Sequence, residues 1–289
     1  METQWPLIIF TLFVCLTCGL LGAISILALR GKGEKLQLPA LVVSFVSLVL
    51  GGVASFLHLQ HWERAFNGFG HLTSGITQEM IGCVALVIIM VLWFIVLRGK
   101  KPVSKVLAGI TLVVALLMIF ATAHSYYMAA RPAWGLSLVA FYLGNACLLG
   151  AIFLWLLAVI RRDEAIEAAG AKMVIVGALA QLVGDGIFVA FCAPAKLADF
   201  GYYLDPTRMT LAPTHIDSLV SYIFTGDGAF AFWGSIVCVI VALSCAIAAR
   251  RKTMASGVLM GTALLVAVTT SILFRVLIYM VGYPVFLLY

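Results

Sequence analysis

The chain carries eight apolar stretches, each long enough to cross a lipid bilayer as a helix. A hydrocarbon core of about 30 Å requires about 20 apolar helical residues. The predicted spans are residues 6–29, 37–59, 79–98, 103–124, 136–160, 172–193, 228–249 and 255–279. Hydrophobic residues make up 64% of the 289 residues and charged residues 10%, whereas soluble domains carry roughly 25% charged residues. We therefore predict an all-α polytopic membrane protein, a bundle of eight transmembrane helices in one integral membrane domain over residues 1–289.

The basic residues of the loops lie mostly on one side of this predicted bundle. Thirteen of the 18 lie in or beside the loops after the first, third, fifth and seventh spans: Arg30, Lys32, Lys35, Arg98, Lys100, Lys101, Lys105, Arg161, Arg162, Lys172, Arg250, Arg251 and Lys252. The loops on the other side carry four: Arg64, Arg131, Lys196 and Arg208. Because cytoplasmic loops are rich in Lys and Arg, we expect both termini outside. The basic residues thus act as orientation signals and do not indicate nucleic-acid binding.

Five ionisable residues interrupt the apolar pattern, and all five fall in the outer half of the predicted spans: His58, Glu79, His124, Asp185 and Arg275. A charged residue inside a span costs about 2.5–3.5 kcal/mol on insertion scales, so each is a candidate functional residue. The inner half has no comparable group. This asymmetry favours a reaction site on one side over a pathway through the membrane.

The outer ends of the second and third spans suggest quinol oxidation. His58 ends one span, Glu79 opens the next, and the loop between them keeps both at a similar depth. An oxidised quinol loses two protons and two electrons, so its hydroxyl groups need acceptors that also carry protons, as His and Glu do. Arg64 would stabilise negative charge on the ring, against which Trp62 and Phe66 would pack. We therefore predict His58 and Glu79 as the catalytic pair.

Structural roles stay open for the same residues. His58 could be an ordinary interfacial histidine, and Glu79 could cap its helix, where the helix dipole favours a carboxylate. Asp185 and Arg275 are expected to form a structural ion pair between the sixth and eighth spans. For His124, a functional and a structural role both remain open.

Two short motifs carry less information. Cys15 and Cys18 have the CxxC spacing, but they lie within a span and have no second pair, so no metal or iron–sulfur site is predicted. Gly257 and Gly261 form a GxxxG motif in the last span. The simplest interpretation of that motif is a close-packing helix face.

The stretch SFLHLQHWERAFNGF, followed by ITQEMIG, resembles the DmsC family, the membrane-anchor subunits of dimethyl-sulfoxide-reductase-type molybdopterin enzymes. The similarity covers the whole chain in number of spans, orientation and loop lengths. The most specific positions are His58-Leu59, Arg64-Ala65-Phe66-Asn67, Glu79 and the start Trp5-Pro6-Leu7. The chain departs from the family pattern at two places. Gln60-His61 stands where the family has a glycine after the His-Leu pair, and Ser271 stands where the family has a glutamate one turn before the last-span arginine. Asp185 is a candidate replacement for that glutamate.

The resemblance implies an eight-helix anchor of the bacterial inner membrane that binds and oxidises menaquinol near its outer face with His58 and Glu79. Electrons would pass to a ferredoxin-like subunit with four iron–sulfur clusters, and from there to a molybdopterin catalytic subunit, in anaerobic respiration. Menaquinol is then the bound substrate, and the anchor itself holds no haem or cluster. Such an anchor does not by itself reduce the terminal acceptor.

Other functions remain open on the residues alone. A haem b anchor needs two facing histidines at one depth, which His58 and His124 could supply. A proton-coupled transporter would place its binding groups near the membrane midplane, which the outer clustering disfavours. A purely structural tether would contain no quinone site.

Overall fold

The computed structural model describes residues 4–58, 70–128, 131, 133–199, 215–251 and 256–282. Its elements are α1 (Trp5–Leu29), α2 (Glu34–His58), α3 (Gly75–Arg98), α4 (Lys105–Ser125), α5 (Ser137–Arg161), α6 (Glu164–Cys192), β1 (Lys196–Asp199), β2 (His215–Ser218), α7 (Leu219–Phe224), α8 (Ala229–Arg250) and α9 (Ser256–Met280). Eight of these helices are long and apolar enough to cross a membrane. The predicted all-α bundle of eight transmembrane helices is therefore confirmed, and the chain is a multi-pass membrane protein.

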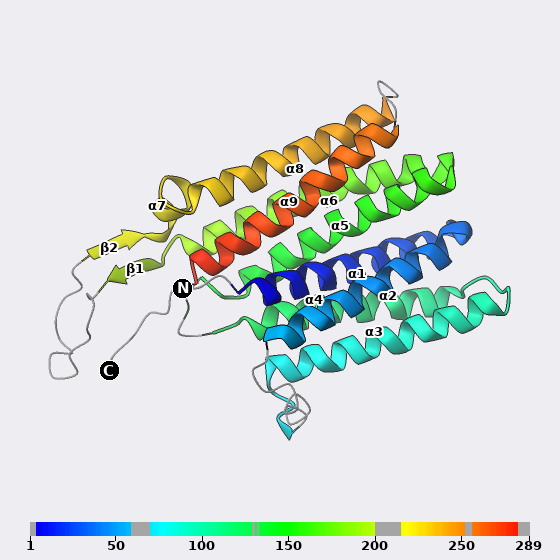
Figure 1. The fold of residues 1–289 in the computed structure, drawn as a ribbon, viewed down its shortest axis with the longest axis horizontal. Coiled ribbons are helices and arrows are strands. Elements are labelled where there is room, and N and C mark those ends of the chain that lie inside the picture. The colour runs from blue at the N-terminus through cyan, green and yellow to red at the C-terminus, as the bar shows by residue number, and fades with distance from the viewer. Residues whose placement is uncertain are drawn as a thin grey trace.

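Successive long helices run in opposite directions, so the bundle has two distinct ends (Figure 1). The ends of α1, α3, α5 and α8 lie together at one end of the bundle. Most of the basic residues flank these helix ends in the sequence, and this end is called the basic end. The starts of α3, α5 and α8 lie at the other end, with the ends of α2, α4, α6 and α9. Because Glu79 lies near the start of α3, this end is called the Glu79 end.

Turn and capping residues set several helix ends at the basic end. Gly31 and Gly33 have φ values of +65° and +78°, a left-handed conformation that favours glycine, and they connect α1 to α2. Asp163 caps α6 by accepting a hydrogen bond from the Ile166 backbone N–H at 3.2 Å. The helix therefore begins at Glu164, earlier than the predicted span start at residue 172, because a capped and charged first turn extends it beyond its apolar part.

Helices α1 and α5 form the centre of the bundle (Figure 1). Over the 18 most apolar consecutive residues of each helix, 78% of the residues of α1 and 67% of those of α5 are buried, against 22% of those of α3 at the edge. Helices α2, α3 and α4 lie on the α1 side, and α6, α8 and α9 lie on the α5 side. The chain thus forms two groups of helices that meet along the α1–α5 contact.

Glycines bring the central helices to backbone contact. A Cβ atom on Gly19 of α1 would collide with the carbonyl oxygen of Ala146, and one on Gly150 of α5 would collide with the Gly19 backbone. Between α5 and α6, a Cβ atom on Gly144 would lie only 2.6 Å from the Ala180 carbonyl oxygen. Small residues that let backbones approach are the usual basis of helix packing in membranes.

The GxxxG motif of α9 does not pack closely against any described part of the chain. A Cβ atom on Gly257 or Gly261 would meet no atom of the described structure within 4 Å, and both residues are exposed. The predicted close-packing face is therefore wrong for contacts inside this chain. Helix α9 packs instead through larger side chains, such as Phe274, whose ring stacks on Phe141 of α5 with centroids 4.6 Å apart.

The long segment between α6 and α8 contains structure that the sequence pattern does not predict. Strands β1 and β2 pair antiparallel, with Lys196 opposite Ser218 and Asp199 opposite His215, and α7 follows directly. Four-residue strands are too short to show a clear period-2 pattern, so a loop is the natural prediction there. The strand pair and α7 lie at the Glu79 end of the bundle (Figure 1).

Candidate functional site

The predicted catalytic residue Glu79 lies one turn into α3. Two glycines of the same helix pack closely against α4: a Cβ atom on Gly75 would lie 2.5 Å from the Ser125 Cα atom, and one on Gly82 would collide with the Met118 sulfur. Residues four positions apart lie on the same helix face, so Glu79 follows Gly75 toward α4. The two glycines thus hold this part of α3 close to α4.

Glu79 does not cap its helix. The apolar pattern places Glu79 at the first residue of the span, whereas α3 begins at Gly75 and its N-cap is Ser74. The N-terminal capping role that the sequence left open for Glu79 is therefore wrong. The first turn, GITQ, is helical, but it is too polar to be recognised as part of an apolar span.

The Glu79 carboxyl group is buried between the two helices, with 9% of the residue exposed. The hydroxyl groups of Thr122 and Ser125 on α4 are its polar neighbours. Its Oε1 atom and the Thr122 Oγ1 atom are both buried and accept or donate no hydrogen bond within the described structure. Because buried polar atoms are nearly always paired, these two atoms are available to a further hydrogen-bonding group.

A packed aromatic cluster of Tyr126, Trp134 and Tyr279 adjoins Glu79. The Tyr126 and Tyr279 hydroxyl groups share a hydrogen bond of 3.1 Å, and both interact electrostatically with Glu79. Trp134 contacts both tyrosine rings edge to face, and the Arg131 guanidinium group lies 4.3 Å from its ring centroid. All three aromatic side chains are buried, so the cluster forms a packed wall beside Glu79.

The other predicted quinol-site residues are only partly described. His58 is the last residue of α2, whose end lies beside the start of α3 (Figure 1), but nothing of its side chain is described. Trp62, Arg64 and Phe66 lie outside the described residues. The roles assigned to these four side chains stay predictions.

His124 lies on a different face of α4 from the Glu79 contacts. It follows Thr122 by two positions, about 200° around the helix. Its ring stacks with Phe120, at 6.3 Å between centroids and 10° between planes, and with Tyr127, at 6.5 Å and 5°. The sequence predicts His124 at the same depth as Glu79, but its position on α4 directs the ring toward Phe120 and Tyr127 and not toward Glu79.

Arg275 is buried in the middle of the bundle, and all its donors are used. Its residue is 1% exposed. The Nε atom donates to Thr11 Oγ1 at 2.9 Å, Nη1 to Asn145 Oδ1 at 2.9 Å and to Ser271 O at 2.8 Å, and Nη2 to Thr11 O at 3.1 Å and to Cys15 Sγ at 3.2 Å. A guanidinium group has five N–H donors, so the side chain is saturated by neighbours on α1, α5 and α9.

Two amide side chains separate Asp185 from Arg275. Asn145, which accepts from Arg275, donates to Gln181 Oε1 at 2.9 Å, and Gln181 donates to Asp185 Oδ1 at 2.6 Å. The predicted direct ion pair between Asp185 and Arg275 is therefore wrong, because the guanidinium group has no donor left and a relay of amides connects the two residues. The four-residue spacing of Gln181 and Asp185 was the sequence signal for this relay, since it places them on one helix face.

The described residues contain no group of three or more His, Cys, Asp or Glu side chains that could hold a metal ion. Of the CxxC pair, Cys15 accepts a hydrogen bond from Arg275, and Cys18 is buried one turn further along α1. Cys15 therefore belongs to the Arg275 network.

Comparison with known families decides what kind of protein this is. A family model described as DMSO reductase anchor subunit (DmsC) matches residues 1–281, nearly the whole chain. The chain belongs to the DmsC family. No curated protein sequence matches it. As a DmsC-family member it is the membrane anchor of a dimethyl-sulfoxide-reductase-type complex, which implies catalytic and iron–sulfur partner subunits.

The resemblance inferred from the sequence is thereby confirmed at the level of the family. The buried Glu79 carboxyl group near the start of α3 lies at the same end of the bundle as the end of α2, and together they form the candidate site. The Arg275 network, by contrast, ties α1, α5, α6 and α9 together in the interior.

Proposed function

We propose that this DmsC-family anchor oxidises menaquinol at the Glu79 end of the bundle and passes the electrons to the iron–sulfur subunit. One observation carries the proposal: the buried Glu79 carboxyl group has an oxygen, Oε1, with no partner in the described structure. A quinol hydroxyl group is a donor that such an oxygen accepts. The adjacent Thr122 and Ser125 hydroxyl groups supply polar contacts for the same ring oxygen.

Oxidation of a quinol breaks two O–H bonds and releases two protons and two electrons. In our proposal, the Glu79 carboxylate accepts one proton and the His58 imidazole accepts the other, each acting as a general base. Glu79 lies four positions after the start of α3, about 6 Å along the helix, so the proton has a short path to the aqueous side. The electrons pass to the iron–sulfur subunit, which we propose to be ferredoxin-like with four clusters, and then to a molybdopterin subunit.

The loop between α2 and α3 completes the proposed site. Arg64 would stabilise negative charge that develops on the ring oxygen as the protons leave, and Trp62 and Phe66 would pack against the ring. These assignments rest on the sequence and on the family resemblance. They are consistent with the end of α2 and the start of α3 lying side by side, since positions 62, 64 and 66 fall between these two helix ends in the sequence.

We further propose that the Glu79 end faces the outer side of a bacterial inner membrane. The loops at the basic end carry most of the basic residues, and such loops remain on the cytoplasmic side. Both termini would then lie outside, and the iron–sulfur subunit would dock at the end where β1, β2 and α7 lie. The whole complex would serve anaerobic respiration.

The decisive experiment replaces the acceptor and keeps its shape. In the purified complex, Glu79→Gln should lower quinol-dependent reduction of the terminal acceptor by about a hundredfold or more. Reduction driven by a soluble dye that feeds the catalytic subunits directly should stay unchanged. Asp185→Asn is the matched control, since it alters another buried carboxyl group, which belongs to the Arg275 network through its hydrogen bond from Gln181.

Two outcomes would overturn the assignment of Glu79. The first is wild-type quinol turnover in the Glu79→Gln complex. The second is an equal loss in the Asp185→Asn complex, because that result would indicate a general effect of altering a buried acid.

We propose that the anchor holds no haem. The haem b alternative needs His58 and His124 to face one another, whereas His124 stacks with Phe120 and Tyr127 on a different face of α4 from the Glu79 contacts. A reduced-minus-oxidised spectrum of the purified complex should show no haem b α-band. A band at one haem per anchor, lost in a His124→Ala variant, would restore the haem alternative.

A further inference from the structure

We propose that a cavity at the basic end of the bundle binds an anionic phospholipid. The positive charges of Arg30, Lys32 and Lys172 around the mouth would attract the phosphate group, and the cavity behind them would hold an acyl chain. This site is separate from the proposed quinol site, which lies at the opposite end of the bundle.

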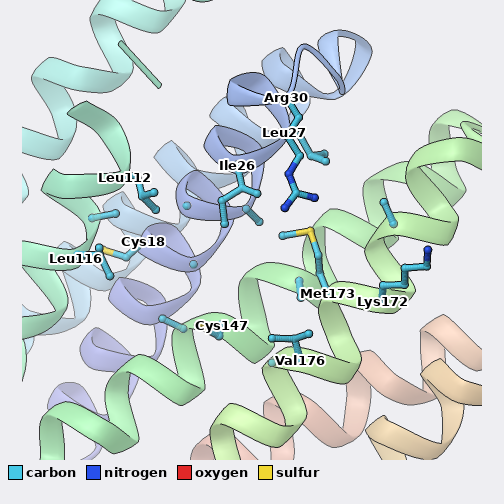
Figure 2. A pocket seen from close by; sticks show the side chains of 18 of the residues that line it. Cys18, Ile26, Leu27, Arg30, Leu112, Leu116, Cys147, Lys172, Met173 and Val176 are labelled. Carbon is cyan, nitrogen blue, oxygen red and sulfur yellow. The ribbon is translucent and has the colours of Figure 1, made fainter. Parts of the chain in front are cut away.

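The cavity has a volume of about 600 Å³ and is lined by residues of α1, α4, α5 and α6 (Figure 2). Ligand sites in proteins typically have volumes of roughly 300–1,000 Å³. Much of the lining consists of small residues, including Gly22, Ala23, Ala146, Ala151 and Ala169. Because short side chains leave space between the helices, an apolar chain fits where larger residues would close the gap.

The mouth of the cavity is positively charged. Arg30, Lys32 and Lys172 belong to its lining, and none of them forms an ion pair with another described residue. Figure 2 shows the Arg30 guanidinium group extending from the end of α1 toward Met173 of α6. Basic pockets between transmembrane helices are suited to anionic lipid head groups, and a guanidinium group binds phosphate in a bidentate way.

The length of the cavity favours a lipid over free phosphate. Its α1 lining runs from Arg30 to Cys18, about 18 Å along the helix axis. A phosphate ion needs only the charged mouth, whereas an acyl chain also uses this apolar length. The occupant that matches both parts is an amphiphile with a negative head and a long apolar chain.

The lining is chemically unsuited to quinol oxidation. Among the described residues that line it, there is no His, Asp, Glu, Tyr, Ser or Thr side chain. A quinol needs acceptors for its hydroxyl protons, whereas the polar side chains at the mouth are cations that only donate. A phosphodiester, which has acceptor oxygens and a negative charge, is the matching partner.

The test compares lipids bound to the purified complex by native mass spectrometry, after exchange into nanodiscs of phosphatidylglycerol and phosphatidylcholine. We expect the wild-type anchor to retain phosphatidylglycerol over phosphatidylcholine by about tenfold or more. The triple variant Arg30→Gln, Lys32→Gln, Lys172→Gln should lose this preference. A matched triple variant, Lys101→Gln, Lys105→Gln, Arg250→Gln, removes exposed cations at the same end that do not line the cavity, and it should keep the preference.

A second variant, Ala169→Phe, fills the cavity and leaves the three cations in place. It should also lose the retained lipid, whereas inorganic phosphate at millimolar concentration should not displace lipid from the wild type. Equal losses in both triple variants would overturn the proposal. So would displacement by phosphate alone, or extraction of a quinone from the wild-type complex that is absent from the Ala169→Phe complex.

Discussion

Two buried carboxyl groups, those of Asp185 and Glu79, lie in different surroundings within this anchor. Asp185 receives a hydrogen bond of 2.6 Å from Gln181 and is linked through Asn145 to Arg275. Glu79 lies near a helix start, where its Oε1 atom has no partner among the described residues. Asp185 also keeps one oxygen, Oδ2, without a partner among the described residues, so the two acids differ in place. Asp185 is tied into the interior network through Gln181, whereas Glu79 lies one turn from a helix start at the end of the bundle.

At the same scale, the Arg275 network predicts a stability effect. Arg275→Met should destabilise the anchor by about 3 kcal/mol, because it leaves several buried acceptors unpaired at roughly 1 kcal/mol or more each. Among them are the Asn145 Oδ1 atom and the carbonyl oxygen of Ser271. The measurement is the melting temperature of the purified complex, followed by the fluorescence of the anchor.

Arg98→Met serves as the control, since Arg98 is an exposed cation at the basic end of α3. It should leave the melting temperature unchanged. Equal melting temperatures for the Arg275→Met variant and the wild type would show that the network does not stabilise the bundle.

At the element scale, the contact between α3 and α4 sets the position of the proposed catalytic carboxyl group. Gly75→Ala places a methyl group against the Ser125 backbone, so α3 must move away from α4. We expect a ten- to hundredfold lower kcat/KM for quinol, which is the order of loss caused by misplacing a catalytic group by about 1 Å.

The matched variant Gly52→Ala lies in α2, where a Cβ atom would meet no described atom within 4 Å. Its kcat/KM for quinol should equal that of the wild type. A Gly75→Ala complex with normal quinol kinetics would contradict the dependence of Glu79 on this helix contact.

The contact between α1 and α5 sets the stability of the bundle. Gly150→Ala should cost about 1–3 kcal/mol or more, because the colliding atoms on Gly19 are backbone and cannot rotate away. The yield of folded complex by size-exclusion chromatography measures this effect. Gly109→Ala in α4 is the control, because a Cβ atom there meets nothing described within 4 Å. Equal yields from the two variants would contradict the close α1–α5 approach.

At the scale of the whole molecule, the two ends of the bundle differ in charge and in chemistry. The proposed quinol site lies at the Glu79 end, and the cation-lined cavity opens toward the basic end. This polarity predicts the orientation in the membrane. Cysteines introduced at Leu72 and Asp227 should react with an impermeant maleimide added to the outside of intact cells, because both positions are exposed at the Glu79 end.

Cysteines at Lys101 and Arg251, which are exposed at the basic end, should react only after the membrane is opened. The seven natural cysteines lie within the long helices and provide a low background. The reverse labelling pattern would overturn the proposed orientation and place the quinol site on the cytoplasmic side.

The sequence by itself determined the number and approximate extent of the membrane-spanning helices. Span length, apolar composition and loop charge are properties of neighbouring residues, so they can be read without knowing how the helices pack. The same reasoning singled out Glu79, because a carboxyl group in an apolar span is costly wherever the helix lies. The predicted start of the third span, residue 79, lies four residues after the start of α3 at Gly75, because a polar first turn extends the helix beyond its apolar part.

Only the tertiary structure decided which distant groups meet. Thr11 and Arg275 are 264 positions apart and share a hydrogen bond, and no local pattern links them. The GxxxG motif of α9 illustrates the same limit, because small residues permit close packing but do not specify a partner. The Asn145–Gln181 relay, the Thr122 contact of Glu79 and the cation-lined cavity all depend on how closely separate helices approach. That approach is set by steric contact between backbones, and it exists only once the bundle has formed.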